Sequence, residues 1–470
     1  MKLPDMTKKA GWITTGDIGY KALSFFISII LARYLGAEKY GWITIGFSML
    51  GYAIWFTDLG LIQIGTRDAA RPKDKRDHPV STLFISRCWL SLAVLFVGST
   101  VLFLMNIPAD QKQFYMLLLC AVIPHGVLLN WYYSGRQRFD KTTIGRIIHN
   151  SLYLLLLVVI LIQTTNAVWV AFAYLTGISL SALYLFATHH NKPVFFSPIP
   201  SLHKMVSAVR NGLIIGTGNI FTQVVILLPP LCIGYFISEE AAGQYGVAFK
   251  LVLGAMAVDH IFTTLYLPVL TSKAIKNSVE ELSQKLSSIT RIIMLTGTVI
   301  GFLLFALAPI IIRLLFGESY MNAIGILQIL CWFTTFTLIN SVFTFGLIAL
   351  GRDHEYFRSA LWGGFISLVI IVSSSAFGNL LWVAWAVTLS ECIIMGFRFF
   401  EFNRCIPIRI NIAFAIVFIT IGLIETIHVH LTLELPALLS VGLLLILLLF
   451  VSSRSITLND WYWLKKRFIK

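Results

Sequence analysis

Long apolar runs, each bounded by charged or turn-forming residues, dominate this chain. A membrane-spanning helix needs roughly 20 mostly apolar residues, and fourteen segments meet this requirement. Runs such as LLLILLLF at residues 443–450 do not alternate as β-barrel strands do, so we predict an all-α integral membrane protein. The predicted transmembrane helices are 11–35, 41–66, 83–104, 114–135, 145–163, 166–188, 211–237, 244–272, 291–315, 323–350, 359–378, 380–402, 408–428 and 434–453.

The composition indicates that the main solvent of the chain is lipid. Hydrophobic residues make up 57% of the 470 residues and charged residues only 12%, and the mean hydropathy is +0.82. A soluble domain carries about 25% charged residues, so a cytosolic enzyme, a secreted protein and a disordered chain are excluded. The net charge of +14 does not indicate nucleic acid, because basic cytoplasmic loops beside anionic lipid account for it. The six cysteines form no C-x-x-C pair and predict neither a disulfide framework nor a metal site.

Basic residues concentrate in alternate loops, which predicts the orientation of the chain. The loops assigned to the outer side, with their flanks, contain only Lys39, Lys112 and Arg313, whereas each inner segment carries several Lys or Arg residues. By the positive-inside rule the basic loops face the cytoplasm, so both termini are predicted to be cytoplasmic. The outer loops are short and leave no room for a catalytic domain.

The sequence contains a weak internal repeat. TGDI at 15–18 recurs as TGNI at 217–220, and AEKYG at 37–41 recurs as AGQYG at 242–246. Six predicted helices separate the copies, so we predict two six-helix lobes related by a pseudo-two-fold axis along the membrane normal. The predicted domains are an N-lobe at 1–188, a cytoplasmic inter-lobe linker at 189–210, a C-lobe at 211–402, an appended helix pair at 403–453 and a basic amphipathic cytoplasmic tail at 454–470.

Four polar residues of the first predicted helix share one helical face: Asp17, Lys21, Ser24 and Ser28. Lys21 lies near the predicted midplane, where inserting a charge costs at least ~2.5–3.5 kcal/mol. At this depth its side chain cannot easily reach the membrane surface. Asp17 and Lys21 could form a purely structural pair at i,i+4. The interpretation that we favour is a cavity-lining cation that meets an anionic substrate, with Asp17 moderating its charge.

Further polar residues extend the candidate substrate site. Asn219 and Gln223 stand four apart at the positions equivalent to this face in the repeat. Lys250 is a candidate for the outer half of the same cavity, and the alternative is that it extends to the outer interface. Arg87 and Arg398 lie near the inner ends of their helices and are expected to mark the membrane interface.

Four residues are candidates for ion coupling. Glu391 lies near the midplane of its predicted helix, and Asp58, Asp259 and His260 lie toward the inner third of theirs. A carboxyl group that burial keeps protonated can carry a coupling proton, and the alternative for each acid is a hydrogen-bonded structural role. No nucleotide motif such as G-x-x-x-x-G-K-[ST] is present, so we expect a gradient of H⁺ or Na⁺ to drive the protein without a cofactor.

Residues 28–70 carry a family resemblance. The first predicted helix ends in LARYLG (31–36), the following loop ends in Tyr40-Gly41, and the second helix contains DLGL (58–61). This segment resembles the opening of the polysaccharide-exporter flippases, the Wzx-type O-antigen flippases. They belong to the MOP superfamily together with the lipid II flippase MurJ and the MATE exporters. The predicted helix count, the duplicated halves and the appended pair are also similar to this group.

The resemblance implies a transporter and not an enzyme. It would move an oligosaccharide linked to undecaprenyl pyrophosphate, such as an O-antigen repeat unit for lipopolysaccharide, from the inner to the outer leaflet of the bacterial inner membrane. The expected partners are this substrate, membrane lipids and other polysaccharide-assembly membrane proteins, and the chain is expected to be a monomer. Two alternatives stay open: a MATE-like cation exporter, which predicts an acidic cavity, and a membrane polymerase or ligase, which predicts a catalytic outer loop.

Overall fold

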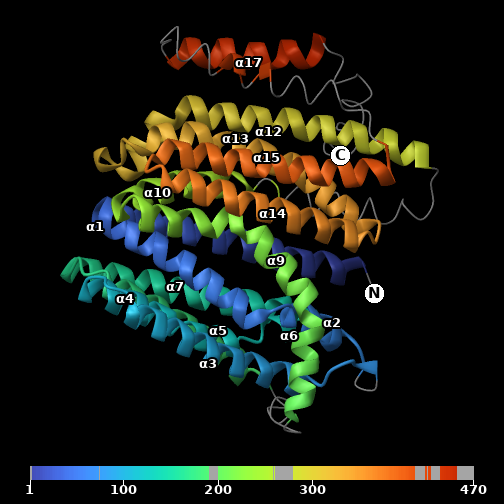
Figure 1. Cartoon of the computed structure of the whole chain (residues 1–470). Coiled ribbons are helices and arrows are strands. Elements are labelled where there is room, and N and C mark those ends of the chain that lie inside the picture. Colours follow the sequence, from blue (N-terminus) through green and yellow to red (C-terminus); the bar gives the residue numbers. More distant parts are fainter. Residues whose placement is uncertain are drawn as a thin grey trace. The chain divides into compact units, whose positions relative to one another are not determined.

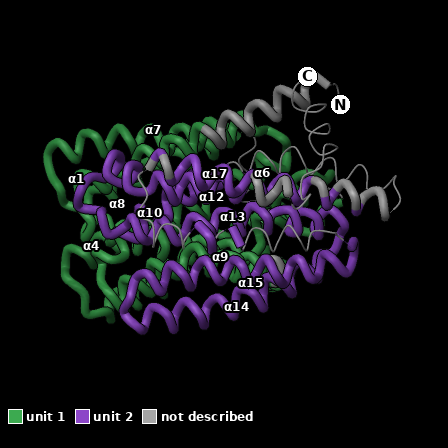
Figure 2. The backbone as a smooth tube through the Cα atoms, turned by 90° about the horizontal axis from the view of Figure 1, so that it is seen from above, with its two compact units in different colours: residues 1–243 green, residues 244–470 purple. Residues whose placement is uncertain are grey.

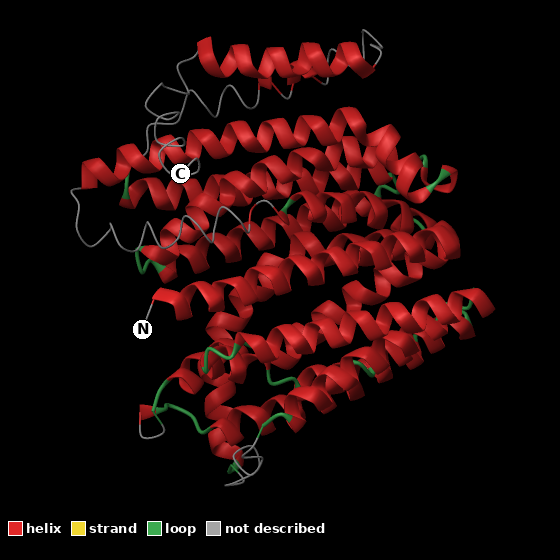
Figure 3. Cartoon of the chain, turned by 180° about the vertical axis from the view of Figure 1, so that it is seen from behind, coloured by secondary structure: helices red, strands yellow, loops and turns green. Residues whose placement is uncertain are grey.

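The protein is helical throughout the part of the chain that the structure describes. This computed structural model describes residues 3–72, 75–189, 200–257, 259, 279–407, 419–420, 422–424 and 435–452. Within these ranges every regular element is a helix (Figures 1 and 3). The prediction of an all-α protein is therefore confirmed for the described residues.

The first half of the chain contains one long helix, a series of shorter ones and another long helix. They are α1 (Leu3–Asp58), α2 (Leu61–Ala70), α3 (Val80–Leu104), α4 (Ala109–Leu119), α5 (Val122–Val127), α6 (Asn130–Gly135), α7 (Phe139–Gln163), α8 (Val168–Ala187), α9 (Leu202–Phe236) and α10 (Glu239–Ala255).

The second half is built mainly from long helices that pack side by side. They are α12 (Val279–Phe316), the short 3₁₀ helix η3 (Glu318–Tyr320), α13 (Ala323–Ala349), α14 (Asp353–Ala376), α15 (Leu380–Cys405) and α17 (Leu435–Ser452). Helix α13 packs against α12 and α15, α15 also packs against α14, and α17 contacts α12.

In the described ranges, ten helices are long and apolar enough to cross a membrane. The predicted helix 408–428 lies mostly outside the described residues, and 244–272 is described only to residue 257 and at 259. The count of fourteen helices therefore stays a prediction. The brief connection expected near Gly378-Asn379 is present, and the Asn379 side chain caps α15 by accepting a hydrogen bond from the backbone N–H of Leu381 (2.9 Å).

Two glycines explain how α1 is divided and how it ends. The apolar part of α1, Gly19–Asp58, has 40 residues, about twice the length of one membrane crossing. Gly36 interrupts it with a non-helical backbone (φ 76°, ψ 173°), at the place where the sequence predicted an outer loop. Gly60 then adopts a left-handed conformation (φ 85°) between α1 and α2. Positive φ values cost a glycine little, because it has no Cβ.

The predicted helix 114–135 is broken into α4, α5 and α6. Pro124 has no backbone N–H, so it cannot complete the helical bond to the carbonyl group of Cys120, which instead accepts from Ile123 (3.1 Å). The backbone of Leu128 departs from helical geometry (ψ 126°) and ends α5. Carbonyl groups are thereby released inside a candidate membrane span, where they need other donors.

The chain forms two compact units, residues 1–243 and residues 244–470 (Figure 2). The first unit includes α9, which packs against α1, α2 and α3. The sequence analysis placed this helix at the start of the C-lobe. The predicted lobe boundaries and their pseudo-symmetry stay predictions.

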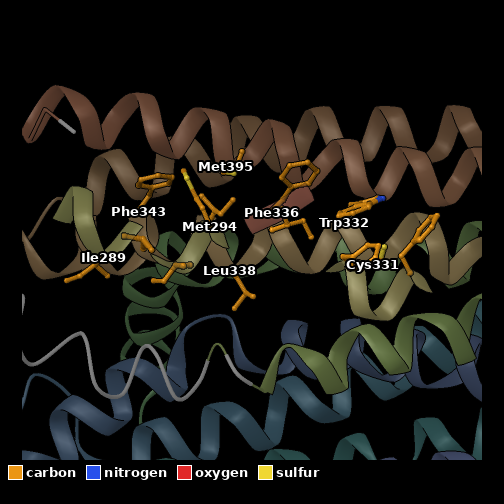
Figure 4. Close-up of a cluster of buried hydrophobic side chains, with 14 of the residues drawn as sticks. Ile289, Met294, Cys331, Trp332, Phe336, Leu338, Phe343 and Met395 are labelled. Carbon is orange, nitrogen blue, oxygen red and sulfur yellow. The ribbon is translucent and has the colours of Figure 1, made fainter. Parts of the chain in front are cut away.

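The core of the second unit is a hydrophobic cluster between α12, α13 and α15. Trp332 and Phe343 of α13 are completely buried, and Met294 of α12 and Met395 of α15 pack in the same cluster (Figure 4). In the most apolar stretch of α13, 89% of the residues are buried, so this helix is surrounded by protein rather than by lipid. The polar groups that it carries can therefore reach other protein groups.

We predict that Gly60→Ala lowers the stability of the protein. The new residue must keep a positive φ, which costs about 1–2 kcal/mol. Its Cβ atom would also lie 2.3 Å from the carbonyl oxygen of Gly212. The thermal unfolding midpoint of the purified protein in detergent measures this loss. Gly396→Ala is the matched control, because a Cβ atom there meets no atom within 4 Å; equal midpoints for the two variants would contradict the prediction.

Candidate functional site

Lys21, the central residue of the predicted substrate site, has an exposed side chain in the first part of α1. Ser28 and Ala32 lie on the same helical face. They are nevertheless buried, with 6% and 0% of their surface exposed. The face that α1 buries near Gly36 is therefore open at Lys21. The side chain of Asp17 lies outside the described residues, so its pairing with Lys21 stays a prediction.

Ser28 is engaged within α1. Its hydroxyl group shares a buried hydrogen bond with the Tyr40 hydroxyl, across the interruption at Gly36. This bond joins the two parts of α1, and Ser24 one turn earlier is partly buried. The structure thus gives Ser28 a structural contact, and sugar binding by Ser24 and Ser28 stays a prediction.

Arg146 is a second cation near this segment of α1; it lies at the inner end of the predicted helix 145–163, and the sequence did not mark it as a candidate for the site. Helix α7 begins at Phe139, so Arg146 lies about two turns inside it, and its side chain is exposed. One turn further, Asn150 donates from Nδ2 to the carbonyl oxygen of Tyr20 (3.0 Å). Arg146 is also close enough to Tyr20 to interact with it electrostatically. Because Tyr20 precedes Lys21, the two exposed cations lie on contacting segments of α1 and α7.

The other predicted binding residues have diverse surroundings. Asn219 and Gln223 on α9 are partly buried, and the Nδ2 atom of Asn219 is buried without a hydrogen-bond partner in the described part of the chain. Lys250 on α10 is partly buried, as is Asp259. His260 lies outside the described residues. The roles proposed for these five residues stay predictions.

Glu391 belongs to a buried polar network between α13 and α15. It is 7% exposed and accepts a hydrogen bond at Oε1 from Nδ2 of Asn340 (2.7 Å). Two turns further along α15, Arg398 donates to the hydroxyl oxygen of Thr344 (2.8 Å) and lies over the Tyr356 ring (5.4 Å to its centroid). Arg398 is only 8% exposed, so protein, and not lipid headgroups, surrounds it, and its position at the membrane interface stays a prediction.

Asp58 and Arg87 are both buried in the first unit and lie close enough to interact electrostatically, without forming an ion pair within 4.0 Å. They are 2% and 3% exposed, so protein surrounds Arg87 as well, and its position at the membrane interface stays a prediction. Arg87 donates to the carbonyl oxygens of Leu128 and His125 (2.9 Å each), where α5 ends. Asp58 accepts at Oδ1 from the backbone N–H of Ile62 (2.7 Å) and so supports the start of α2. These contacts give Asp58 a structural role, and its predicted role in ion coupling stays a prediction.

The comparisons with known proteins agree with this helical architecture. Residues 6–258 match the model of a family described as "Polysaccharide biosynthesis protein". This match covers more than half of the chain. The chain belongs to this polysaccharide biosynthesis protein family.

Two relatives of this chain are named as transporters. The chain is 20% identical over 375 residues to the "Putative O-antigen transporter" of Escherichia coli (strain K12), covering 77% of this chain and 88% of that protein. It is 22% identical over 411 residues to the "Succinoglycan biosynthesis transport protein ExoT" of Rhizobium meliloti (strain 1021), covering 79% of each chain.

Among solved structures, the chain is similar to the lipid II flippase MurJ in an inward closed conformation. The TM-score is 0.70 at 14% sequence identity, and the match covers 95% of this chain and 99% of that one. This likeness shows that the chain has a MurJ-like fold. The family match and the relatives named as transporters identify the chain as a transporter, a multi-pass membrane protein of a bacterial transporter family, as the resemblance implied.

We predict that Arg87→Ala destabilises the protein by about 3–5 kcal/mol, because it leaves a buried carboxylate and two carbonyl oxygens without their cationic partner. Replacing both charges, as Arg87→Met with Asp58→Asn, is expected to restore part of the loss. Thermal unfolding in detergent measures both effects.

The matched control is Arg138→Met. This residue forms an ion pair with Asp140 (3.0 Å), but its side chain is 56% exposed. An exposed pair contributes about 0–1 kcal/mol. A single Arg87→Ala variant as stable as Arg138→Met would show that Arg87 does not hold the broken helix.

Proposed function

We propose that this transporter moves an oligosaccharide linked to undecaprenyl pyrophosphate from the inner to the outer leaflet of the bacterial inner membrane. The observation that carries the proposal is a cationic surface: Lys21 of α1 and Arg146 of α7 are both exposed and lie on contacting segments of their helices. An exposed charge this far inside apolar helices is expensive unless water or an anion surrounds it. The membership in a polysaccharide biosynthesis family supports the sugar part of the substrate.

The chemistry of a pyrophosphate headgroup fits two cations better than one. A pyrophosphate carries several negative charges that must leave bulk water to cross the membrane. An arginine can bind two phosphate oxygens through its planar fork, while a lysine acts as a compact point charge. Lys21 and Arg146 together would neutralise more of the headgroup than either alone. The lipid tail can remain in the bilayer, and polar side chains such as Asn219, Gln223 and Lys250 are candidate contacts for the sugars.

In this proposal both termini are cytoplasmic and the chain acts as a monomer. The concentration of Lys and Arg in alternate loops supports the orientation. Lys21 lies near the predicted midplane of the first predicted helix, which enters the membrane from the cytoplasmic side where the substrate is loaded. Other polysaccharide-assembly proteins are candidate partners that would supply or receive the lipid-linked sugar.

We propose that an ion gradient, of protons or sodium, drives the cycle, and that Glu391 carries a coupling proton. The support is its position: a carboxyl group buried among apolar helices, hydrogen-bonded by a single amide from Asn340. A proton on such a group removes a charge from the membrane interior. Asp259 and His260 remain further candidates for the same role.

We predict that Lys21→Ala reduces delivery of surface polysaccharide at least tenfold, because the headgroup loses a fixed cation worth about 1.4 kcal/mol or more. Lys21→Arg keeps the charge and should retain more activity. Surface polysaccharide of cells that carry each variant is measured against the amount of protein in the membrane.

The matched control is Lys39→Ala, which removes a partly buried lysine of the predicted outer loop that donates to the carbonyl oxygen of Thr165 (3.1 Å). It should leave delivery unchanged. Normal delivery by the Lys21→Ala variant would remove Lys21 from the mechanism and withdraw the main support for an anionic substrate.

We predict that Glu391→Gln lowers proton-gradient-driven transport several-fold, while the protein still folds because glutamine can accept the same bond from Asn340. The measurement is transport of the lipid-linked substrate in reconstituted vesicles, with and without a pH gradient. Glu318→Gln is the control, because Glu318 is 72% exposed and pairs with the exposed Arg313 (3.0 Å). Unchanged gradient dependence in the Glu391→Gln variant would reject this role.

A further inference from the structure

Histidine and tyrosine side chains from three helices form a polar cluster inside the first unit. The His125 ring of α5 shares a hydrogen bond between Nε2 and the Tyr174 hydroxyl of α8 (3.1 Å). The His149 ring of α7 lies 5.0 Å from the Tyr174 ring and 6.4 Å from the Tyr153 ring, measured between centroids. His149 lies about 15 Å along α7 from Phe139. We call these four residues the His–Tyr cluster.

Two polar atoms of the His–Tyr cluster are buried without a hydrogen-bond partner among the described residues. They are Nε2 of His149 and the hydroxyl oxygen of Tyr153, one turn apart on α7. The two residues are 6% and 4% exposed. Native proteins rarely leave buried polar atoms unpaired, because their desolvation is then uncompensated. Such atoms point to a function that needs them open.

A glycine on α8 makes the position of His149 possible. A Cβ atom at Gly177 would lie 2.8 Å from the carbonyl oxygen of His149 and 3.0 Å from its ring carbon Cδ2. Any side chain at Gly177 would therefore displace the imidazole or the helix. The close approach of α7 and α8 holds this ring in a defined place with one nitrogen open.

The groups around His149 decide what it can bind. Histidine is the side chain whose charge changes near neutral pH. Several titratable or charged groups of the described residues face the His–Tyr cluster from the neighbouring helices. They are Tyr20 and Tyr40 of α1, Arg87 of α3, His125 of α5, Arg146 and Tyr153 of α7, and Tyr174 of α8. The two tyrosine rings next to His149 can stabilise an imidazolium, whereas the positive charges of Arg87 and Arg146 oppose it.

We propose that His149 is a proton-binding site of the transport cycle. A proton from water binds to Nε2, the ring becomes an imidazolium beside Tyr153 and Tyr174, and the same proton later returns to water. The role in the cycle rests on the proposed function, whereas proton binding at His149 does not. This site lies in the first unit and is separate from Glu391 in the second.

The backbone connects His149 to the cationic surface. The next residue, Asn150, donates to the carbonyl oxygen of Tyr20, which directly precedes Lys21. A charge that appears on His149 therefore acts on the α1 segment that carries Lys21. Binding of an anion at Lys21 and binding of a proton at His149 must then affect each other to the same extent, because such coupling is reciprocal.

The test is histidine NMR on the full-length protein in detergent, labelled with ¹³C at the histidine Cε1 atoms. The signal absent from the His149→Gln spectrum belongs to His149. We expect this signal to titrate between about pH 4 and 8. We also expect its midpoint to move by at least about 0.5 pH unit, a threefold change in proton affinity, when undecaprenyl diphosphate is added.

Two further variants make the outcome decisive. Tyr153→Phe removes only an unpaired hydroxyl group, so it should fold and should shift the midpoint of the His149 signal. His354→Gln removes an exposed histidine in the first turn of α14 and should leave that signal unchanged. If His149→Gln fails to fold, the signal that shifts in Tyr153→Phe identifies the site.

The possible results separate the two proposals. A His149 signal that does not titrate in this range, or no histidine signal that responds to Tyr153→Phe, overturns the proton site. A signal that titrates but ignores undecaprenyl diphosphate, although the lipid binds, overturns its role in the cycle. Absence of any lipid binding by the unaltered protein contradicts the proposed function, while the titration still decides whether His149 binds a proton.

Discussion

The cost of placing charge in an apolar medium governs this structure. A buried ion is tolerated when other protein groups compensate it, and otherwise it needs water or a ligand. Arg87 meets this requirement with two backbone carbonyls and nearby Asp58. Arg398 meets it with the Thr344 hydroxyl and the Tyr356 ring. Lys21 is instead exposed on a helix face that is buried further along, and this difference makes it the candidate for substrate binding.

The same constraint relates the broken helix to its charge. Pro124 interrupts the hydrogen bonding of the segment from α4 to α6, and the carbonyl groups released near the end of α5 would be costly in a membrane. Arg87 donates to two of them, and its own burial is compensated in turn. The break and the arginine thus stabilise each other, and neither would be favourable without its partner.

The positions of most helices could be predicted from the sequence, because each apolar run is long enough to cross a membrane by itself. The roles of the charged residues could not. Arg146 lies at the edge of its predicted helix, 145–163, and nothing in the sequence shows that α7 contacts the segment of α1 that carries Lys21. The hydrogen bonds of Arg87 could not be predicted either. Its partners are backbone carbonyl groups about 40 residues away along the chain, and a single sequence does not show that contact. The His–Tyr cluster likewise depends on packing between α5, α7 and α8. The candidate substrate site was therefore predicted only in part, through Lys21 and its face of α1.

The central claim is that the cationic surface at Lys21 recognises the phosphorylated headgroup of a lipid-linked substrate. The most direct measurement compares the affinities of the purified protein for undecaprenyl diphosphate and for undecaprenol, which has the same tail and no phosphate. The account predicts at least about tenfold tighter binding of the diphosphate, equivalent to about 1.4 kcal/mol, and loss of this difference in the Lys21→Ala variant. Equal affinities for the two lipids in the unaltered protein would contradict it.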